Sequence, residues 1–354
     1  MNAVFICQTV DEHDYILAVC TQWISALARH VQIRHVDVIC LRKGAYRLPD
    51  NVSVNAVGKT RRIATLANFY HHIIRITKQK EVDFFFVHMG GWYPLLLLPW
   101  KLFGKKPIYQ WKTHPHIDPV MRLSAYVADN LVFTAAKSSM PLRSAKVKVV
   151  GHGIDTHAFS PRAETKSGTL LTIGRITPRK NITLLIQTVH EYHRKYNKRL
   201  SLDIIGPCEG KDAHYSDRLK KLIAEKSLGE HVSIRPPVRH GELAGLMNHY
   251  TLFVNFSRTG LDKATLEAMA CGLPVLSTNP SFGEILPGHL RHILFDTAQD
   301  PVILADRVHH LLSLGRGEQE KTAAQLRRLV VEHHSIDALF DKILDEINRD
   351  KKQC

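Results

Sequence analysis

Short apolar runs alternate along this chain with longer segments in which apolar residues recur every three or four positions. The short runs have the length of buried strands, and the longer segments have the spacing of amphipathic helices. This alternation is typical of an α/β protein with parallel sheets flanked by helices. Strands are predicted to begin at Ala3, Val36, Asp83, Pro107, Asn130, Thr169, Leu202, Val232, Leu252 and Pro274, with helices between them that include 16–30, 181–196 and 215–229.

The same rhythm occurs in both halves of the chain. A length of 354 residues favours two domains or one large one, and two blocks of similar size favour two. We therefore predict two Rossmann-like domains, residues 1–150 and 151–354, with a hinge within 151–161. The segments after Pro301 are predicted as closing helices, and the last of them are candidates to cross back to the first domain.

The most apolar stretch is FFFVHMGGWYPLLLLPW at 84–100. It holds a histidine, two glycines and two prolines, which exclude a continuous membrane-spanning helix. A buried strand, a glycine turn and a short apolar helix are predicted instead. The aromatic residues Trp92, Tyr93 and Trp100 precede three lysines at 101–106, so this segment is either an interfacial patch or a core helix with a solvated basic end.

Composition narrows the class of protein. Hydrophobic residues make up 44% and charged residues 23% of the chain, which is ordinary globular usage and argues against disorder. The six cysteines form no C-x-x-C pair, so they predict neither a zinc ribbon nor a disulfide framework and favour a reducing compartment. The first residues, MNAVFICQTVDEHD, do not have the pattern of a secretory signal. We therefore expect a cytoplasmic protein, with a peripheral position on the inner face of the membrane as an alternative.

Positive charge is concentrated in the first half of the chain. Residues 1–150 carry 20 Lys and Arg against 9 Asp and Glu, a net +11, whereas the remaining residues carry 28 against 24, a net +4. Such a basic half indicates an anionic partner, for example a membrane surface, a phosphorylated substrate or nucleic acid. Nucleic acid is the least favoured of these, because the cations are dispersed and are not interleaved with aromatic residues.

The strongest local motif is SRTGLDKATLEAMACGLPV, which begins at Ser257 and follows a predicted strand. It passes through a turn and enters a helix that Gly272 and Pro274 terminate. The N-terminus of such a helix presents unpaired amides that suit a phosphate or a sugar hydroxyl. Glu267, inside the helix, is suited to accept hydrogen bonds from ribose hydroxyls. From spacing alone, a surface glutamate of an ordinary αβ unit is an equally good interpretation.

A second motif, GRITPRKN, runs from Gly174 to Asn181 directly after another predicted strand. It places cations at the carboxyl end of a strand, where open α/β sheets bind ligands. Arg175 suits a diphosphate through its forked guanidinium, and Lys180 suits it as a point charge. Basic residues are common in such loops, so this motif alone is weak. Neither motif matches the glycine pattern of dinucleotide or P-loop sites, which disfavours a nicotinamide-dependent dehydrogenase.

With both motifs in this order, the sequence resembles the family 4 retaining glycosyltransferases, which have the GT-B fold of two facing Rossmann-like domains. The likeness covers most of the chain and is strongest over 149–277. It implies a retaining hexosyltransferase that moves a sugar from a nucleotide-diphosphate donor to an acceptor hydroxyl, in glycan, polysaccharide or glycolipid assembly. The acceptor, a saccharide or a lipid-linked one, would bind the first domain and the donor the second. No cofactor is expected, because the nucleotide sugar is a substrate.

The resemblance also assigns roles to residues. In the family, an Arg and a Lys that match Arg175 and Lys180 hold the donor diphosphate, and a glutamate that matches Glu267 binds the ribose. The family's first motif glutamate falls at Thr259, so Asp262 or the Thr259 hydroxyl would contact the donor sugar instead. The predicted donor-binding residues are Gly174, Arg175, Lys180, Thr259, Gly260, Leu261, Asp262, Lys263 and Glu267.

Histidines supply the candidates in the first half. The family often has a histidine near the transferring sugar at the end of a strand, and His114 is the nearest match, with His116 as a fallback. Together with Arg175 and Lys180, His114 is predicted to be catalytic. The acceptor-side candidates are Asp11 and His13 in the opening loop, and His88 in the loop after the strand at 83–87.

No Asp-x-Asp triplet occurs in the chain. Glycosyltransferases of the other major fold use such carboxylates to hold a divalent metal on the diphosphate. We therefore predict a metal-independent reaction, in which Arg175, Lys180 and helix-end amides offset the charge. The alternatives are a GT-B nucleotide-sugar epimerase and, less favoured, a basic nucleic-acid-binding protein.

Overall fold

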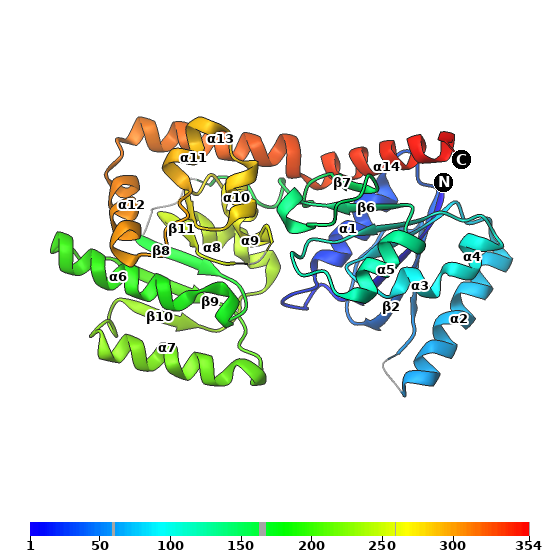
Figure 1. Cartoon of the computed structure of the whole chain (residues 1–354), viewed down its shortest axis with the longest axis horizontal. Coiled ribbons are helices and arrows are strands. Elements are labelled where there is room, and N and C mark those ends of the chain that lie inside the picture. The colour runs from blue at the N-terminus through cyan, green and yellow to red at the C-terminus, as the bar shows by residue number, and fades with distance from the viewer. Residues whose placement is uncertain (59–60, 163–167, 259, 354) are drawn as a thin grey trace. The chain divides into compact units, whose positions relative to one another are not determined.

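The computed structural model describes residues 1–58, 61–162, 168–258 and 260–353, and the chain divides into two compact units (Figure 1). Unit 1 comprises Met1–Gly153 and Ile336–Cys354, and unit 2 comprises Ile154–Ser335. The first junction lies three residues from the predicted boundary at 150/151. The second predicted domain extends to residue 354 with its last helices as candidates to cross back, and the structure assigns the last helix, α14 (Ile336–Gln353), to unit 1.

Unit 1 is built on a parallel sheet of seven strands in the order β3-β2-β1-β4-β5-β6-β7. Its order reverses between β1 and β4, so the loops after these two strands flank a topological switch point. The edge strands β3 and β7 escape prediction because they are short and only partly buried. The strands are β1 (Asn2–Val10), β2 (His35–Lys43), β3 (Val52–Ala56), β4 (Phe84–His88), β5 (Ile108–Trp111), β6 (Leu131–Thr134) and β7 (Val147–Val149).

Helices cover both faces of this sheet, and β4 is therefore buried along its whole length. On one face, Phe85 packs in a core cluster with Phe69 and Ile73 of α2. On the other face, Phe86 lies 6.4 Å from the ring of Phe340 in α14. The helices of unit 1 are α1 (Val19–Arg29), α2 (Arg62–Gln79), α3 (Tyr93–Leu96), α4 (Leu98–Leu102), α5 (Pro119–Val127), the short 3-10 turn η1 (Lys137–Ser139) and α14.

The apolar stretch at 84–100 folds as predicted, into strand β4, a turn, and the short helices α3 and α4. No helix in the described part of the chain is both long enough and apolar enough to span a bilayer. Of the two alternatives for the aromatic residues of this stretch, the interfacial patch applies to Trp92 only, and the core helix applies to Tyr93 and in part to Trp100. Trp92 is exposed, but Tyr93 is buried and Trp100 is half-buried against the ring of Tyr70 at 6.0 Å.

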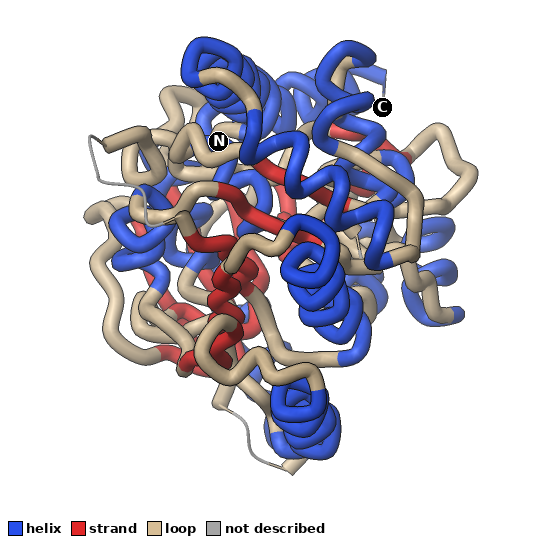
Figure 2. The backbone as a smooth tube through the Cα atoms, turned by 90° about the vertical axis from the view of Figure 1, so that its left-hand side faces the viewer, coloured by secondary structure: helices blue, strands red, loops and turns tan. Residues whose placement is uncertain are grey.

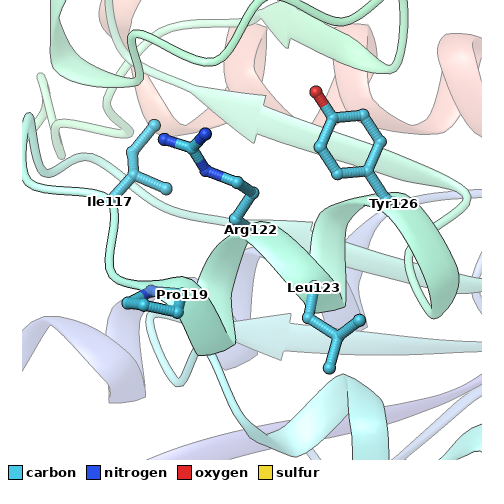
Figure 3. A pocket seen from close by; sticks show the side chains of 5 residues that line it. All are labelled: Ile117, Pro119, Arg122, Leu123 and Tyr126. Carbon is cyan, nitrogen blue, oxygen red and sulfur yellow. The ribbon is translucent and has the colours of Figure 1, made fainter.

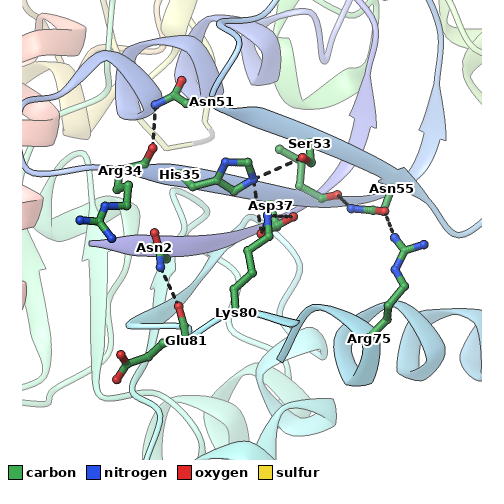
Figure 4. Close-up of polar contacts among 11 residues, drawn as sticks. Asn2, Arg34, His35, Asp37, Asn51, Ser53, Asn55, Arg75, Lys80 and Glu81 are labelled. Carbon is green, nitrogen blue, oxygen red and sulfur yellow. Dashed lines mark hydrogen bonds and ion pairs between the residues drawn. The ribbon is translucent and has the colours of Figure 1, made fainter. Parts of the chain in front are cut away.

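A polar cluster holds the outer edge of this sheet (Figure 4). Asp37, buried in β2, forms an ion pair with Lys80 just beyond α2, at 3.0 Å. His35 of the same strand hydrogen-bonds Ser53 of β3 at 3.2 Å. A buried carboxylate needs such a partner, because removing its charge from water is otherwise costly. The pair therefore fixes the end of α2 against the edge of the sheet.

Unit 2 has a parallel sheet of five strands in the order β10-β9-β8-β11-β12, all of them predicted. The order reverses between β8 and β11. Figure 2 colours these strands red and the helices beside them blue. The strands are β8 (Thr169–Ile173), β9 (Ser201–Ile205), β10 (Val232–Arg235), β11 (Leu252–Asn255) and β12 (Val275–Ser277).

Some helices of unit 2 connect its strands, and the others follow β12 (Figure 1). The α-helices are α6 (Ile182–Tyr196), α7 (Ala213–Glu225), α8 (Leu243–Asn248), α9 (Lys263–Ala270), α10 (Pro280–Ile285), α11 (Gly288–Leu294), α12 (Pro301–Ser313) and α13 (Arg316–His334). The 3-10 turns are η2 (Pro178–Lys180), η3 (Gly210–Asp212) and η4 (His240–Glu242). Helix α9 and turn η2 follow the two strands at the switch point, so they define where a ligand site is expected.

Candidate functional site

The two predicted donor motifs meet at the switch point of unit 2. One is the loop from β8 to η2, and the other is the loop from β11 to α9. Their backbones are joined by a hydrogen bond from Arg258 N to Arg179 O at 3.0 Å. Thr259, which was predicted to contact the donor sugar, lies outside the described residues.

Two glycines allow the β8 loop to pack closely. Gly174 has a φ of 149°, and a Cβ there would lie 3.0 Å from Lys180 Cε. Gly206, at the end of β9, has a φ of 159°, and a Cβ there would overlap the carbonyl oxygen of Gly174. Only glycine fits such positions without strain. The loop therefore lies directly on the end of β9, with Lys180 folded back over Gly174.

Lys180 and Asp262 form the centre of this site. Lys180 Nζ lies 2.6 Å from Asp262 Oδ1, and Asn255 Nδ2 donates to Asp262 Oδ2 at 2.7 Å. Burial, the largest single cause, would raise the pKa of Asp262, but the charge of Lys180 and the hydrogen bonds from Lys180, Asn255 and Ser257 together lower it below its ordinary value. The carboxylate is therefore ionised, and it offsets part of the charge of Lys180.

Asp262 is also the N-cap residue of α9, yet its side chain does not cap the helix. An aspartate at this position usually accepts a hydrogen bond from an amide of the first helical turn. Here the carboxylate is turned to Lys180 and Asn255 instead. The first turn of α9 therefore has amides without a cap from Asp262, next to a lysine ammonium, and this combination suits an anionic oxygen.

Glu267 lies one turn further along α9 and is only 2% exposed. Its Oε1 contacts Lys263 Nζ and lies 2.6 Å from His240 Nε2. The same ring nitrogen lies 2.7 Å from Lys263 Nζ. The tautomer of His240 therefore decides whether this nitrogen donates a hydrogen bond to Glu267 or accepts one from Lys263. Burial raises the pKa of Glu267, but Lys263 and His240 lower it to about 2. Glu267 is thus a buried acceptor that is ionised at neutral pH.

The remaining predicted donor residues have different surroundings. Arg175 is exposed, and its only described ion pair is with the half-exposed Glu209 at 3.5 Å, a type of contact that contributes little. Its guanidinium is therefore weakly held. Gly260 and Leu261 are buried, and Gly260 O accepts from Asn279 Nδ2 at 3.1 Å. These two residues shape the turn before α9 through their backbone.

The opening loop of unit 1 holds Asp11 and His13, just after β1. Asp11 Oδ1 accepts a hydrogen bond from the backbone amide of His13 at 3.0 Å. Asp11 is partly buried by this turn, whereas His13 is exposed. The structure thus places both residues at the carboxyl edge of the sheet, beside the switch point, where acceptor-side residues are expected.

The predicted position of His88 is wrong. It is not in a loop but is the last residue of β4, where it pairs in register with Trp111 of β5. Its ring stacks on Trp111 at 5.4 Å, and Nδ1 lies 3.6 Å from Cys20 Sγ. Strand β4 continues through His88 because this residue still pairs with Trp111, the last residue of β5. His88 is a buried core residue.

His114 lies in the loop between β5 and α5. Its Nδ1 accepts a hydrogen bond from the amide of His116 at 3.1 Å, and the two rings are 6.4 Å apart. His114 is half-buried and His116 exposed. The backbone amide of His116 therefore helps to orient the ring of His114 at the carboxyl edge of the sheet.

Residues 167–314 of the chain match the family model described as Glycosyl transferases group 1. This matched segment is less than half of the chain and lies within unit 2. It contains the β8 loop, helix α9 and the residues that contact them in unit 2. The predicted likeness to a GT-B glycosyltransferase is confirmed, while the narrower assignment to family 4 stays a prediction.

Curated relatives of the chain are glycosyltransferases by name. It is 29% identical over 188 residues to a D-inositol 3-phosphate glycosyltransferase of Frankia alni, covering 47% of this chain and 44% of the relative. It is 26% identical over 237 residues to a D-inositol 3-phosphate glycosyltransferase of Kineococcus radiotolerans, covering 54% of each. It is 31% identical over 140 residues to a GDP-mannose:cellobiosyl-diphosphopolyprenol α-mannosyltransferase of Xanthomonas oryzae, covering 39% and 36%. The chain thus spans about half or less of the length of these relatives.

Solved structures confirm the predicted fold over the whole chain. The chain matches Anabaena HepE in complex with UDP and glucose with a TM-score of 0.77 and 15% identity, covering 99% of this chain and all of that one. It matches a glycosyltransferase from Rickettsia africae with a TM-score of 0.76 and 13% identity, covering 100% of both chains. At these identities the likeness establishes the fold, which is GT-B.

His240 and Asn255 are residues of the matched segment that the sequence did not single out. His240 begins the 3-10 turn η4 after β10, nearly thirty positions before Glu267. Asn255 ends β11 and bonds both Asp262 and Thr265. Each forms its contacts through tertiary structure, so no spacing in the sequence links it to its partner. Among the residues that the structure describes, no group of three or more His, Cys, Asp or Glu is arranged to hold a metal ion.

A separate cavity of about 510 Å³ lies on the outer side of α5 in unit 1 (Figure 3). Its lining is apolar except for Arg122, which lies between Ile117 and Tyr126 in the figure. Leu123 and Tyr126 are exposed, so the cavity is a shallow surface depression. It is lined by Ile117, Pro119, Arg122, Leu123 and Tyr126.

Proposed function

We propose that this chain is a retaining glycosyltransferase that moves a hexosyl group from a nucleotide-diphosphate sugar to an acceptor hydroxyl, in the assembly of a glycan, polysaccharide or glycolipid. The observation that carries the proposal is the Lys180–Asp262 pair at the N-terminus of α9. It lies at the switch point of a sheet within the segment that matches the glycosyltransferase family model. The relatives' names support both the reaction and a nucleotide-activated donor.

The donor diphosphate is assigned to Lys180, Arg175 and the first-turn amides of α9. An ammonium has three donor hydrogens, so Lys180 can donate to a phosphate oxygen while it keeps its hydrogen bond to Asp262. As the glycosidic bond breaks, negative charge grows on the diphosphate. A cation and amide dipoles already fixed in place stabilise that charge more than they stabilise the bound donor, which lowers the barrier.

The donor ribose is assigned to Glu267. Its carboxylate is ionised, and its position on α9 places it one to two turns from the proposed diphosphate site. An ionised carboxylate accepts two hydroxyl hydrogen bonds well. Lys263 and His240 keep the charge on Glu267 in the absence of donor, so they act as positioning residues.

Retention follows from a front-face route in this proposal. The two carboxylates of the site, Asp262 and Glu267, are both engaged by cations, so neither is presented as a nucleophile for a double displacement. The acceptor hydroxyl would instead attack from the side of the leaving group. Its oxygen forms the new bond to the anomeric carbon while its proton passes to the departing phosphate oxygen. His114 is proposed to position the sugar or acceptor during this step.

The acceptor is proposed to be lipid-linked or saccharide, held at unit 1 near an anionic membrane surface. One side of α2 supports this, because Ile63, Leu66 and Ile74 are exposed at helical spacing, with Ile63 at 84%. Leu102 and Phe103 at the end of α4 are exposed as well, Phe103 at 89%. Exposed basic residues flank these side chains, as expected of an interfacial helix. The flanking residues are Arg61, Arg62, Arg75, Lys78 and Lys105.

Thermal unfolding with a panel of nucleotide sugars tests the donor assignment. A ligand that binds only the folded protein raises its apparent melting temperature. We expect one of UDP-glucose, UDP-N-acetylglucosamine and GDP-mannose to stabilise the wild type but not Lys180→Ala. Lys195→Ala is the matched control, because Lys195 forms an ordinary surface ion pair on α6. Stabilisation of neither protein by any nucleotide sugar, together with no transfer to acceptors, would overturn the proposal.

A further inference from the structure

Lys112 of unit 1 is a buried lysine whose ammonium lacks a partner among the described residues. It directly follows β5, where its amide donates to Phe133 O at 2.9 Å, and the residue is only 8% exposed. Within the described part of the chain, no hydrogen bond or ion pair reaches its Nζ. Lysines are almost never buried to this degree unless they are paired.

The surroundings of Lys112 explain why its charge is costly in the free protein. A Cβ on Gly91 would lie 3.3 Å from Lys112 Nζ and 3.3 Å from Met121 Sδ, so the ammonium fits beside a glycine and a thioether. Burial lowers the pKa of Lys112, and the more distant carboxylates of Asp118 and Asp129 oppose this only in part. A partly desolvated cation in such surroundings is expected to gain from an incoming anion.

The position of Lys112 is that of a ligand-binding residue. It stands at the carboxyl end of β5, next to the β4 turn that contains Gly91, and two residues before His114. Strand β4 is one side of the switch point of this sheet, and open α/β sheets bind ligands at that edge. Gly91 has no side chain, so none from this position covers the ammonium.

We propose that Lys112 binds a phosphate group carried by the acceptor, either a soluble phosphate ester or a lipid phosphate. The acceptor role rests on the proposed function, whereas the anion site itself does not. The phosphate takes no part in bond making: it fixes the acceptor, so that a hydroxyl elsewhere in the molecule reaches the donor. Lys112 is therefore a binding residue and not a catalytic one.

Phosphate titration of the full chain tests the site. The Lys180→Ala variant is used throughout, so that the donor diphosphate site does not contribute, and ionic strength is held constant with sodium chloride. Binding of inorganic phosphate is measured by calorimetry in this variant and after adding Lys112→Gln or Lys43→Gln. Lys43 is the matched control, because it is an exposed lysine at the carboxyl end of β2 in the same sheet.

We expect Lys112→Gln to weaken phosphate binding about tenfold or more, and Lys43→Gln to leave it unchanged. Nuclear magnetic resonance of the lysine side chains provides a second readout, in which phosphate raises the pKa of Lys112 in the folded protein. A purely structural lysine would show no such response. Equal phosphate binding with and without Lys112, or a Lys112 resonance that ignores phosphate, would overturn the inference.

Two further titrations distinguish the source of the phosphate. Glycerol 3-phosphate provides the soluble ester, and phosphatidic acid in phosphatidylcholine vesicles provides the same group on a lipid. Lys112-dependent binding of glycerol 3-phosphate alone assigns a soluble acceptor, and Lys112-dependent binding of the phosphatidic acid vesicles assigns a lipid acceptor. Failure of every nucleotide sugar to bind, with Lys112-dependent phosphate binding intact, would overturn the proposed function and leave the anion site standing. A response to neither ester would overturn the acceptor role.

Discussion

Lys180 Nζ lies 2.6 Å from Asp262 Oδ1, so the lysine assigned to the donor diphosphate is already paired in the free protein. The pair is fixed from both sides, by Gly174 beneath the lysine and by Asn255 beside the aspartate. This arrangement orients the ammonium at the N-terminus of α9 before donor binds. In the proposed function, the donor diphosphate would share this cation with the Asp262 carboxylate.

Removing Lys180 should separate catalysis from folding. We expect Lys180→Ala to lower kcat/KM for transfer by about 100- to 1,000-fold, the usual loss when one preorganised donor to a developing charge is removed. It should also destabilise the protein by about 1–3 kcal/mol, because Asp262 is left without its cation. The double variant Lys180→Met, Asp262→Asn should recover stability but not turnover. Wild-type rates in both Lys180→Ala and Arg175→Ala would refute the diphosphate assignment.

The buried carboxylate of Glu267 predicts a specific dependence of stability on pH. Its pKa in the folded protein is about 2, below the ordinary value of 4.5. The ionised group therefore stabilises the fold fully above pH 4.5, and this contribution is lost as pH falls from 4.5 towards 2. It amounts to the order of 3 kcal/mol. Denaturant unfolding of wild type and Glu267→Gln should show a gap that shrinks over this window, and a pH-independent gap would contradict the assignment.

The close approach of Gly206 to Gly174 predicts a sensitive position outside the charged residues. Gly206→Ala should push the β8 loop outwards, because its methyl group would overlap Gly174 O. We expect weaker donor binding, about tenfold in KM, and a loss of about 1–3 kcal/mol in stability. Gly210→Ala is the control, since nothing lies within 4 Å of a Cβ there. Enzyme kinetics and thermal unfolding measure both effects, and identical behaviour of the two variants would be inconsistent with loop packing at this point.

The exposed apolar side of α2 and α4 predicts membrane binding. Ile63→Asp and Phe103→Asp should each reduce cosedimentation with vesicles that contain phosphatidylglycerol, because each removes an exposed apolar contact and adds repulsion from anionic lipid. Val31→Asp is the control, since Val31 is equally exposed in unit 1 but lies in a loop away from these helices in sequence. High salt should weaken binding of the wild type. No vesicle binding by the wild type at low salt would dismiss the membrane interaction.

The proposed use of fixed cations predicts how the enzyme responds to chelation. Transfer should be unchanged by EDTA and should not rise when magnesium is added back, because Lys180, Arg175 and the α9 amides supply the positive charge. Initial rates with and without chelator provide the measurement. Loss of activity that magnesium restores would instead assign a metal to the diphosphate.

The sequence is enough to predict the two Rossmann-like units and the loops at the switch point of unit 2, because strand length, periodicity and motif order are local properties. The pairing partners are not local. His240 contacts Glu267 from a different strand–helix connection, and Asn255 contacts Asp262 only once the turn between them has closed. Sequence spacing predicts which residues reach the site, but not which of them neutralise each other there.

Errors in the prediction also have physical causes. The sequence pattern predicts His88 in the loop after the strand at 83–87, yet its flat ring packs against Trp111 as an aromatic residue would. Strands β3 and β7 lie at the sheet edges, where partial burial weakens the apolar signal. No sequence pattern indicated that Lys112 is buried, because burial of a lysine depends on the shape of the turn that faces it.

Helix α14 has a consequence for how this protein is made. Its residue Phe340 packs against Trp23 with ring centroids 5.6 Å apart, so a segment synthesised after unit 2 completes a core begun near residue 20. On the ribosome, unit 2 emerges whole before unit 1 has its closing helix. Until α14 is synthesised, the aromatic surface of unit 1 that it covers stays exposed. A nonsense codon just before Ile336 would leave that surface permanently accessible to chaperones and proteases.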